Sequence, residues 1–164
     1  YKSYYNRALC YGKLRMPREE ESDFRRAAEL QPRNVNIIYH LGMLCERQDR
    51  IREAMQFFNE AIEIDSKFAP VYHARGMIYD KQENYQASYI EFSKAIELDA
   101  SSAVSYHNRA CSLKNMGRYE EAVADFLRSL ELDPSNPLTY ANIAIVYRRL
   151  EKYETAIDYF TKEI

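Results

Sequence analysis

The sequence predicts an all-α fold built from helix-turn-helix repeats. The chain repeats itself every 34 residues without a slip in register, which is the length of one such unit. The twenty-fourth position of every repeat is aromatic: Phe24, Phe58, Phe92, Phe126 and Phe160. The eighth position is always small: Ala8, Gly42, Gly76, Ala110 and Ala144. A small residue facing a large one lets two antiparallel helices pack closely, so both columns are expected in the core.

The repeats divide the chain without gaps. They cover residues 1–34, 35–68, 69–102, 103–136 and 137–164, and the last is incomplete. Asn34, Ser102 and Asn136 are expected to cap the first helices of the second, fourth and fifth repeats, because their side chains accept bonds from free backbone N–H groups. Pro137 suits the first helical position.

The second helix of the first repeat departs from the pattern. Glu20 and Glu21 stand where an alanine and an apolar residue are expected. Pro17 begins this helix, and acidic residues in its first turn suit the helix dipole. We therefore predict a looser and shifted second helix here, and no acidic ligand site.

Composition excludes several classes of protein. The chain is 46% hydrophobic and 29% charged, with a net charge of −2, so no basic stripe predicts nucleic-acid binding. No apolar run approaches the roughly 20 residues of a membrane span, and no signal peptide precedes the first repeat. Because the chain opens on Tyr1 and stops inside a repeat at Ile164, we expect it to be a fragment of a larger protein.

The three cysteines are an odd number at positions that are not equivalent between repeats. Cys10, Cys45 and Cys111 are therefore expected to be free thiols, in the cytoplasm or another reducing intracellular compartment. Cys45 replaces a large residue and is expected to behave as a small core residue.

Residues 117–122 (GRYEEA) and 130–134 (LELDP) resemble the tetratricopeptide repeat family, as do the recurring small and aromatic columns. The resemblance covers essentially the whole chain. It implies a right-handed α-solenoid of about five repeats, a single domain over residues 1–164, whose concave wall is formed by the first helix of each repeat.

Positions two, five, six, nine and thirteen of each repeat share one helical face, which the packing positions leave unused. Position nine is apolar throughout: Leu9, Met43, Met77, Cys111 and Ile145. Exposed apolar surface of this extent usually marks a partner, and methionine suits an adaptable contact. The alternative is that another part of the protein covers the column.

Position six carries Asn6, His40, Asn108 and Asn142, interrupted by an alanine. A carboxamide donates to and accepts from a peptide backbone at once, so we expect these side chains to face a ligand. The arrangement resembles the asparagine ladder of O-linked N-acetylglucosamine transferases, although Asn is also common here in the family. Position five adds Tyr5, Tyr39, His73 and His107, and the basic residues Arg148 and Arg149 complete the predicted partner-binding set.

A metal site is not expected, because the histidines of neighbouring repeats are separated by at least the roughly 8–10 Å between packed helices. Nor does any catalytic constellation or cofactor motif occur, so the chain is not expected to be an enzyme. Chaperone adaptors of the family bind Hsp70 or Hsp90 tails through a two-carboxylate clamp, but only Asn108 matches that clamp when it is read from the third repeat.

The leading hypothesis is a non-catalytic scaffold that binds a peptide or helical segment of a protein partner in a concave groove. Two alternatives remain open: a substrate-presenting segment of a larger enzyme, and a structural solenoid that self-associates through its ends. Neither nucleic acid nor membrane is expected as a partner.

Overall fold

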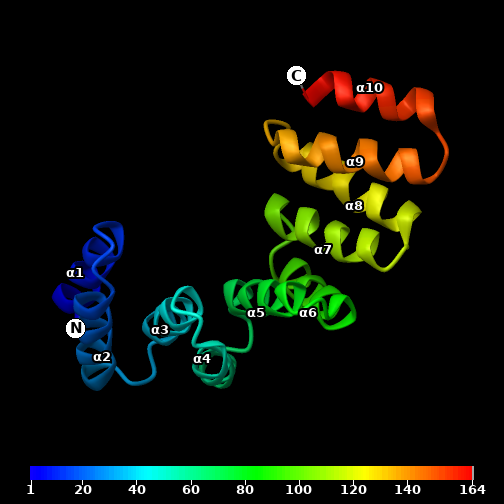
Figure 1. The fold of residues 1–164 in the computed structure, drawn as a ribbon. Helices are drawn as coiled ribbons and strands as arrows, with labels where there is room; N and C mark the ends of the chain where they lie inside the picture. The colour runs from blue at the N-terminus through cyan, green and yellow to red at the C-terminus, as the bar shows by residue number, and fades with distance from the viewer. Residues whose placement is uncertain (164) are drawn as a thin grey trace. The chain divides into compact units, whose positions relative to one another are not determined.

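The computed structural model describes residues 1–163, with only the backbone of Glu163, and this part of the chain forms ten α-helices and no strand (Figure 1). The helices are α1 (Lys2–Lys13), α2 (Pro17–Leu30), α3 (Val35–Arg47), α4 (Ile51–Ile64), α5 (Ala69–Lys81), α6 (Tyr85–Leu98), α7 (Ala103–Asn115), α8 (Tyr119–Leu132), α9 (Pro137–Arg149) and α10 (Tyr153–Glu163). The predicted all-α fold of helix-turn-helix repeats is confirmed.

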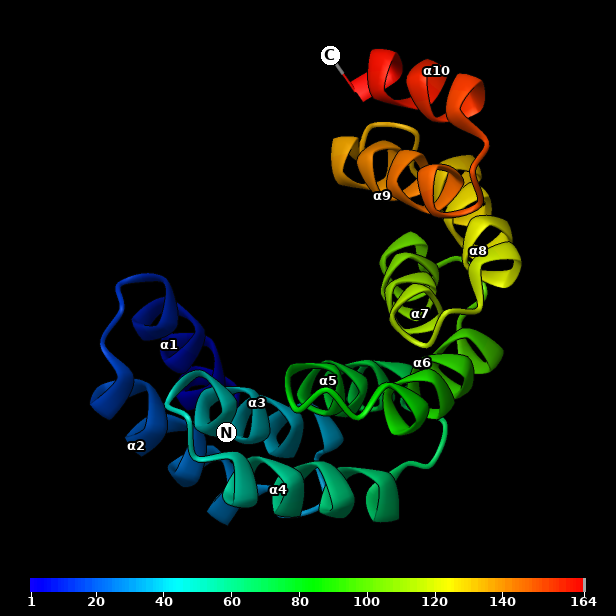
Figure 2. The same ribbon diagram turned by 45° about the vertical axis from the view of Figure 1, so that its right-hand side comes forward.

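The chain divides into two compact units, residues 1–74 and residues 75–164, which we call the N-terminal and C-terminal units. In the N-terminal unit α1 packs on α2, α2 on α3, and α3 on α4. In the C-terminal unit the same pattern runs from α6 to α10. Figure 2 shows α1 with α2, α3 with α4, and α9 with α10 as helical hairpins closed by short turns. The single continuous solenoid over residues 1–164 stays a prediction.

The aromatic column forms the core of the first four hairpins, whereas its fifth member, Phe160, is half-buried. Four of its rings are completely buried: Phe24, Phe58, Phe92 and Phe126. A Cβ atom on Gly42 would lie 2.5 Å from the Phe58 ring, and one on Gly76 would lie 2.7 Å from the Phe92 ring. The expected facing of small and large residues is therefore confirmed, and in these two hairpins the ring occupies the space of the missing side chain.

The predicted helix starts are also confirmed. The side chain of Asn34 accepts hydrogen bonds from the backbone N–H groups of Asn36 and Ile37. Ser102 caps α7 and Asn136 caps α9 in the same way. Pro17 and Pro137 each stand in the first turn of their helices, where a missing N–H costs nothing.

The prediction of a shifted second helix in the first repeat is wrong. α2 occupies the same repeat positions as α4, because the buried Glu20 side chain fits over Gly12. A Cβ on Gly12 would lie 2.8 Å from Glu20 Oε1, so only glycine leaves room for the carboxylate. Arg47 donates a hydrogen bond of 2.5 Å to this carboxylate, which compensates its burial.

A recurring contact was not predicted from the sequence: in three repeats an arginine at position seven pairs with an acid at position twenty-three of the same repeat. The pairs are Arg7–Asp23, Arg75–Glu91 and Arg109–Asp125. The first and third are two-pronged, with N···O distances of 2.6 to 2.8 Å. Each pair ties the two helices of a hairpin together, alongside the aromatic core.

Truncating a core ring tests this arrangement. We expect Phe58→Ala to lower the free energy of unfolding by about 3–5 kcal/mol, because the ring fills the site beside Gly42 and would leave a cavity. Phe57→Ala is the matched control, since Phe57 is only partly buried on the same helix. Urea unfolding followed by circular dichroism measures both. Equal losses for the two variants would contradict the proposed role of the Phe58 ring.

Candidate functional site

In the N-terminal unit, six of the predicted partner-binding residues lie on two neighbouring first helices. Tyr5, Asn6 and Leu9 are on α1, and Tyr39, His40 and Met43 are on α3. The ring centroids of Tyr5 and His40 are 5.5 Å apart, so these two helices bring their predicted faces together. We call this surface of α1 and α3 the N-terminal wall.

His40 is the centre of an aromatic cluster. Its imidazole stacks on Phe24 with centroids 5.3 Å apart and contacts Tyr39 edge-on. Burial lowers the pKa of His40, and the nearby Arg47 guanidinium lowers it further. The ring is therefore neutral at pH 7 and acts first as a packing element. Burial also raises the pKa of Tyr5 and of Tyr39.

The N-terminal wall carries a polar hollow of about 250 Å³ at the amino ends of its helices. It is lined by Tyr1, Lys2, Tyr5, Asn6, Asn34 and Asn36. The carboxamides of Asn6 and Asn36 have no hydrogen-bond partner among residues 1–163. Four of these residues, Tyr1, Lys2, Asn34 and Asn36, were missed by sequence reasoning. Lys2 and Asn36 both stand at position two of their repeats, which belongs to the predicted face. Their position was therefore the signal from which they could have been predicted.

A second hollow of about 450 Å³ lies at the carboxyl ends of the same helices. It is lined by Gly12, Arg15, Pro17, Glu20, Leu44, Arg47 and Gln48. Glu20 already receives Arg47, so the carboxylate in this hollow is compensated within the chain. Two guanidinium groups, Arg15 and Arg47, remain largely exposed at its rim.

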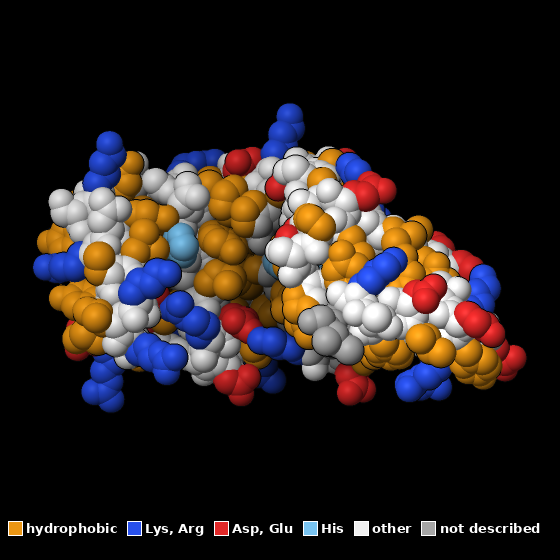
Figure 3. Space-filling model, turned by 90° about the horizontal axis from the view of Figure 1, so that it is seen from above, with side chains coloured by type: hydrophobic (Ala, Val, Ile, Leu, Met, Phe, Trp, Pro, Cys, Tyr) orange, Lys and Arg blue, Asp and Glu red, His pale blue; other side chains and the backbone are white. Residues whose placement is uncertain are grey.

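The charge of the N-terminal wall is positive. Lys2, Lys13 and Arg15 are exposed and have no carboxylate partner among residues 1–163. Most other arginines of this unit are paired, for instance Arg25 with Glu21 and Arg26 with Glu29. On the face drawn in Figure 3, Lys and Arg side chains gather over the left-hand part of the view, where α1 to α4 lie.

The C-terminal unit arranges its predicted residues differently, because the carboxamides among them are bonded to other groups of the same unit. Asn108 Nδ2 donates to Met77 Sδ at 3.1 Å. Asn142 Oδ1 accepts from Lys114 at 2.5 Å, and Asn142 Nδ2 donates to the Leu138 carbonyl at 3.0 Å. A ligand backbone would have to displace these bonds before it reached either carboxamide.

His107 and Cys111 lie side by side on α7. The His107 Nε2 and Cys111 Sγ atoms are 3.6 Å apart, and His107 Nδ1 shares a hydrogen bond of 2.7 Å with the buried Thr139 hydroxyl. Burial raises the pKa of Cys111 to about 11 and lowers that of His107. The thiol therefore stays protonated at neutral pH, which is the opposite of an activated nucleophile.

The other predicted residues are distributed as follows. Ile145 is half-buried on α9, while Arg148 and Arg149 are exposed at its carboxyl end. His73 lies on the part of α5 that belongs to the N-terminal unit, and burial lowers its pKa. The cysteines are free thiols as predicted, and Cys45 is buried.

Among residues 1–163, no three His, Cys, Asp or Glu side chains lie together in a way that suits a metal ion. No helix in the described part of the chain has both the length and the apolar character that crossing a bilayer requires.

Three family models, each described as a tetratricopeptide repeat, match the sequence. One covers residues 1–34, 35–68 and 69–102, another covers 103–136, and the third covers 126–158. The chain belongs to the tetratricopeptide repeat family. No curated protein matched the chain.

Solved tetratricopeptide repeat proteins share the fold at low sequence identity. MamA from Desulfovibrio magneticus RS-1 is 15% identical, with a TM-score of 0.87 over 99% of this chain and 92% of that one. Pseudomonas aeruginosa PilF is 20% identical, with a TM-score of 0.90 over 99% and 74%. YrrB, described as a TPR protein with an unusual peptide-binding site, is 21% identical. Its TM-score is 0.79, over 98% of this chain and 83% of that one.

The histidines of this tetratricopeptide repeat chain predict a pH dependence. Because burial lowers the folded-state pKa of His40 and His107, the unfolded chain binds protons more readily. The contribution of the two neutral histidines to the free energy of unfolding is therefore fully present above the unfolded-state pKa of about 6.5. It is lost as the pH drops from there toward their lower folded-state pKa values. Urea midpoints at pH 7.5 and 5.5 measure the loss.

A variant isolates the contribution of one ring. His40→Phe keeps an aromatic ring against Phe24 and removes the titrating group, so we expect a smaller difference between the two midpoints than in the parent chain. An unchanged difference would show that His40 does not contribute to the pH dependence.

Proposed function

We propose that this chain is a non-catalytic protein-interaction scaffold whose N-terminal wall binds an extended, acidic segment of a protein partner. The observation that carries the proposal is the combination, at the two ends of α1 and α3, of two hollows with cations and carboxamides that have no partner within residues 1–163. Each of these features suits a different part of such a segment.

The apolar part of the ligand is expected between the two hollows. Leu9 on α1 and Met43 on α3 are half-buried, so each leaves apolar surface in contact with water. Methionine adapts its shape to a partner because it is unbranched and polarizable. A medium-sized apolar side chain of the partner therefore has a matching place on this wall.

Carboxylates of the ligand are expected at the cations. Lys2 stands at the first hollow and Arg15 at the second, and neither has a carboxylate partner among residues 1–163. Complementary charge across an interface mainly raises the rate of encounter and excludes wrong partners. An acidic segment satisfies these cations, whereas a basic segment is repelled.

The peptide backbone of the ligand is expected at the carboxamides of Asn6 and Asn36. Both side chains are unpartnered within residues 1–163, so each offers a donor and an acceptor without breaking an existing bond. Asn108 and Asn142 in the C-terminal unit are already bonded, which favours the N-terminal wall as the gripping surface. YrrB, which shares the fold and is described as having an unusual peptide-binding site, gives the proposal a precedent.

A peptide-library selection on the purified chain tests the proposal. We expect the enriched peptides to carry several Asp or Glu residues around an apolar one. The double variant Lys13→Glu with Arg15→Glu should weaken their binding roughly tenfold or more, because it replaces attraction by repulsion at exposed sites. High salt should weaken binding to the parent chain.

The control is Arg52→Glu, which reverses an exposed cation on α4, outside the wall, that forms no ion pair within the described residues. It should bind the selected peptides like the parent. Enrichment of peptides without acidic residues, or equal effects of the control and the double variant, would overturn the proposal. Circular dichroism confirms that each variant is folded.

A further inference from the structure

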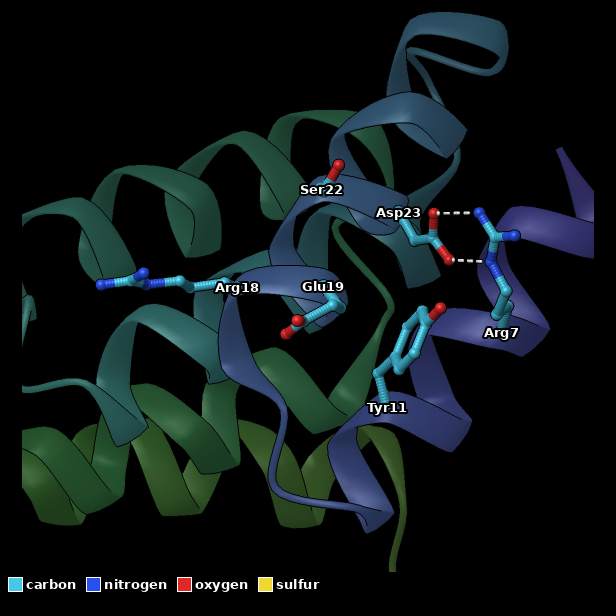
Figure 4. A pocket seen from close by; sticks show the side chains of 6 residues that line it. All are labelled: Arg7, Tyr11, Arg18, Glu19, Ser22 and Asp23. Atoms are coloured by element: carbon cyan, nitrogen blue, oxygen red, sulfur yellow. Dashed lines mark hydrogen bonds and ion pairs between the residues drawn. The ribbon is translucent and has the colours of Figure 1, made fainter.

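Positions seven and twenty-three face each other within a repeat, and in three repeats they form an ion pair. Figure 4 shows the first of these pairs, in which two hydrogen bonds join Arg7 to Asp23. The second repeat carries Leu41 and Phe57 at the same two positions. It therefore presents apolar groups where the first, third and fourth repeats present charged ones.

The fourth repeat shows what the charged pair does between repeats. Arg109 on α7 bonds to Asp125 on α8 and also donates to Ser93 on α6, with an N···O distance of 3.2 Å. The Arg109 guanidinium also lies 5.9 Å from the centroid of the Tyr89 ring on α6. This one side chain therefore connects α6 with α8, the second helices of two consecutive repeats.

The second repeat lacks this connection, because Leu41 has no polar group in its side chain. Arg25 stands at the repeat position of Ser93, but it donates to Glu21 on its own helix at 2.7 Å. A hollow of about 290 Å³ lies between α2 and α4, the second helices of the first two repeats. We call it the α2–α4 hollow.

The floor of the α2–α4 hollow is apolar and lies on α3. Ile38 and Leu41 line the hollow, and each is only 3% exposed. They are three residues apart, on the side of α3 opposite to Tyr39 and Met43 of the N-terminal wall. Phe57 on α4 is partly buried and adds its ring to the lining. A ligand in this hollow therefore leaves the N-terminal wall accessible.

The charge beside the hollow is negative. Arg25 and Glu29 at the rim already have ion-pair partners on α2. Glu60 on α4 also lines the hollow, is exposed and forms no ion pair within residues 1–163. Glu63, one turn further along α4, is exposed and equally without an ion pair in this part of the chain. A cation next to an apolar side chain complements this surface.

The hollow offers little to an extended peptide backbone. None of the eight residues that line it carries a carboxamide or a hydroxyl group, in contrast to Asn6 and Asn36 on the N-terminal wall. An extended segment docked here would leave its own N–H and C=O groups without partners where it covers the hollow. A helix bonds these groups internally, so a helical segment suits this surface better.

We propose that the α2–α4 hollow docks an amphipathic helix of a protein partner, with an apolar anchor that lies against Leu41 and Phe57 and a lysine or arginine that pairs with Glu60. Phe57 and Glu60 are three residues apart on α4, so a helix that lies along α4 carries its anchor and its cation three or four residues apart. A volume of about 290 Å³ is slightly below the range of about 300–1,000 Å³ for small-molecule sites, and it suits one anchoring side chain of a larger partner. The proposal does not rest on the acidic ligand of the N-terminal wall.

Selection from a library of helices displayed on a folded coiled-coil scaffold tests the proposal. We expect the enriched helices to carry Leu, Ile or Phe three or four residues from Lys or Arg. Calorimetric titration of one enriched scaffold into the full chain then measures Kd. Glu60→Lys should raise Kd about tenfold or more, because it replaces attraction by repulsion at an exposed site.

A second variant fills the hollow with the groups that the fourth repeat uses. It combines three changes: Leu41→Arg, Phe57→Asp and Arg25→Ser. The new arginine then reaches across to the new serine, as Arg109 reaches Ser93, and the variant should no longer bind the enriched helix. Circular dichroism checks that this variant is folded, and Glu60→Lys tests the proposal without any change in the core.

The control for charge is Glu19→Lys, which reverses an exposed carboxylate on α2 that lies outside the hollow and forms no ion pair within the described residues. It should bind the enriched helix like the parent. The double variant Lys13→Glu with Arg15→Glu should also bind it like the parent, so the two binding surfaces can fail separately.

Three outcomes would overturn the proposal. The first is enrichment of helices without the expected cation, and the second is an equal effect of Glu60→Lys and Glu19→Lys. The third is self-association of the chain that Glu60→Lys abolishes, which would assign the hollow to a second copy instead of a partner protein.

Discussion

The packing of an aromatic ring into the space above a small residue sets the geometry on which every other feature depends. Where the eighth position is glycine, as in Gly42 and Gly76, the ring approaches to a distance that no Cβ would permit. The two helices of a hairpin are therefore held close by their inner faces. The candidate site is found on the remaining face of the first helices in the N-terminal unit, where Asn6, Leu9 and Met43 keep surface in contact with water although His40 also packs on Phe24.

The arginine–acid pairs add a second constraint at the point where one repeat meets the next. Arg109 bonds to Asp125 within its hairpin and to Ser93 in the preceding one, so a single guanidinium joins three helices. In the fifth repeat Ile143 and Tyr159 occupy the equivalent positions and belong to an apolar cluster. Ionic and apolar pairs therefore fill the same site, and the arginine adds directional bonds to it.

The period of the sequence was sufficient to predict the helices, their caps and the core rings, because each depends on residues within one repeat. It was insufficient for Glu20, whose place depends on the absence of a side chain at Gly12 and on Arg47 from the next repeat. The same reason explains why the hollows were missed. A hollow is defined by side chains from two helices and a turn, and no spacing along one helix reports it.

The two units illustrate why an equal residue type does not imply an equal role. Asn6 and Asn142 share a repeat position, but Lys114 and the Leu138 carbonyl satisfy Asn142, while the Asn6 carboxamide has no partner within residues 1–163. Using Asn142 to bind a ligand means breaking bonds that already exist, and a net hydrogen bond contributes only about 0.5–1.5 kcal/mol. The exchange at Asn142 is therefore close to neutral, whereas Asn6 gains a partner. Affinity for an extended chain is accordingly expected where the polar groups of the wall are left unsatisfied.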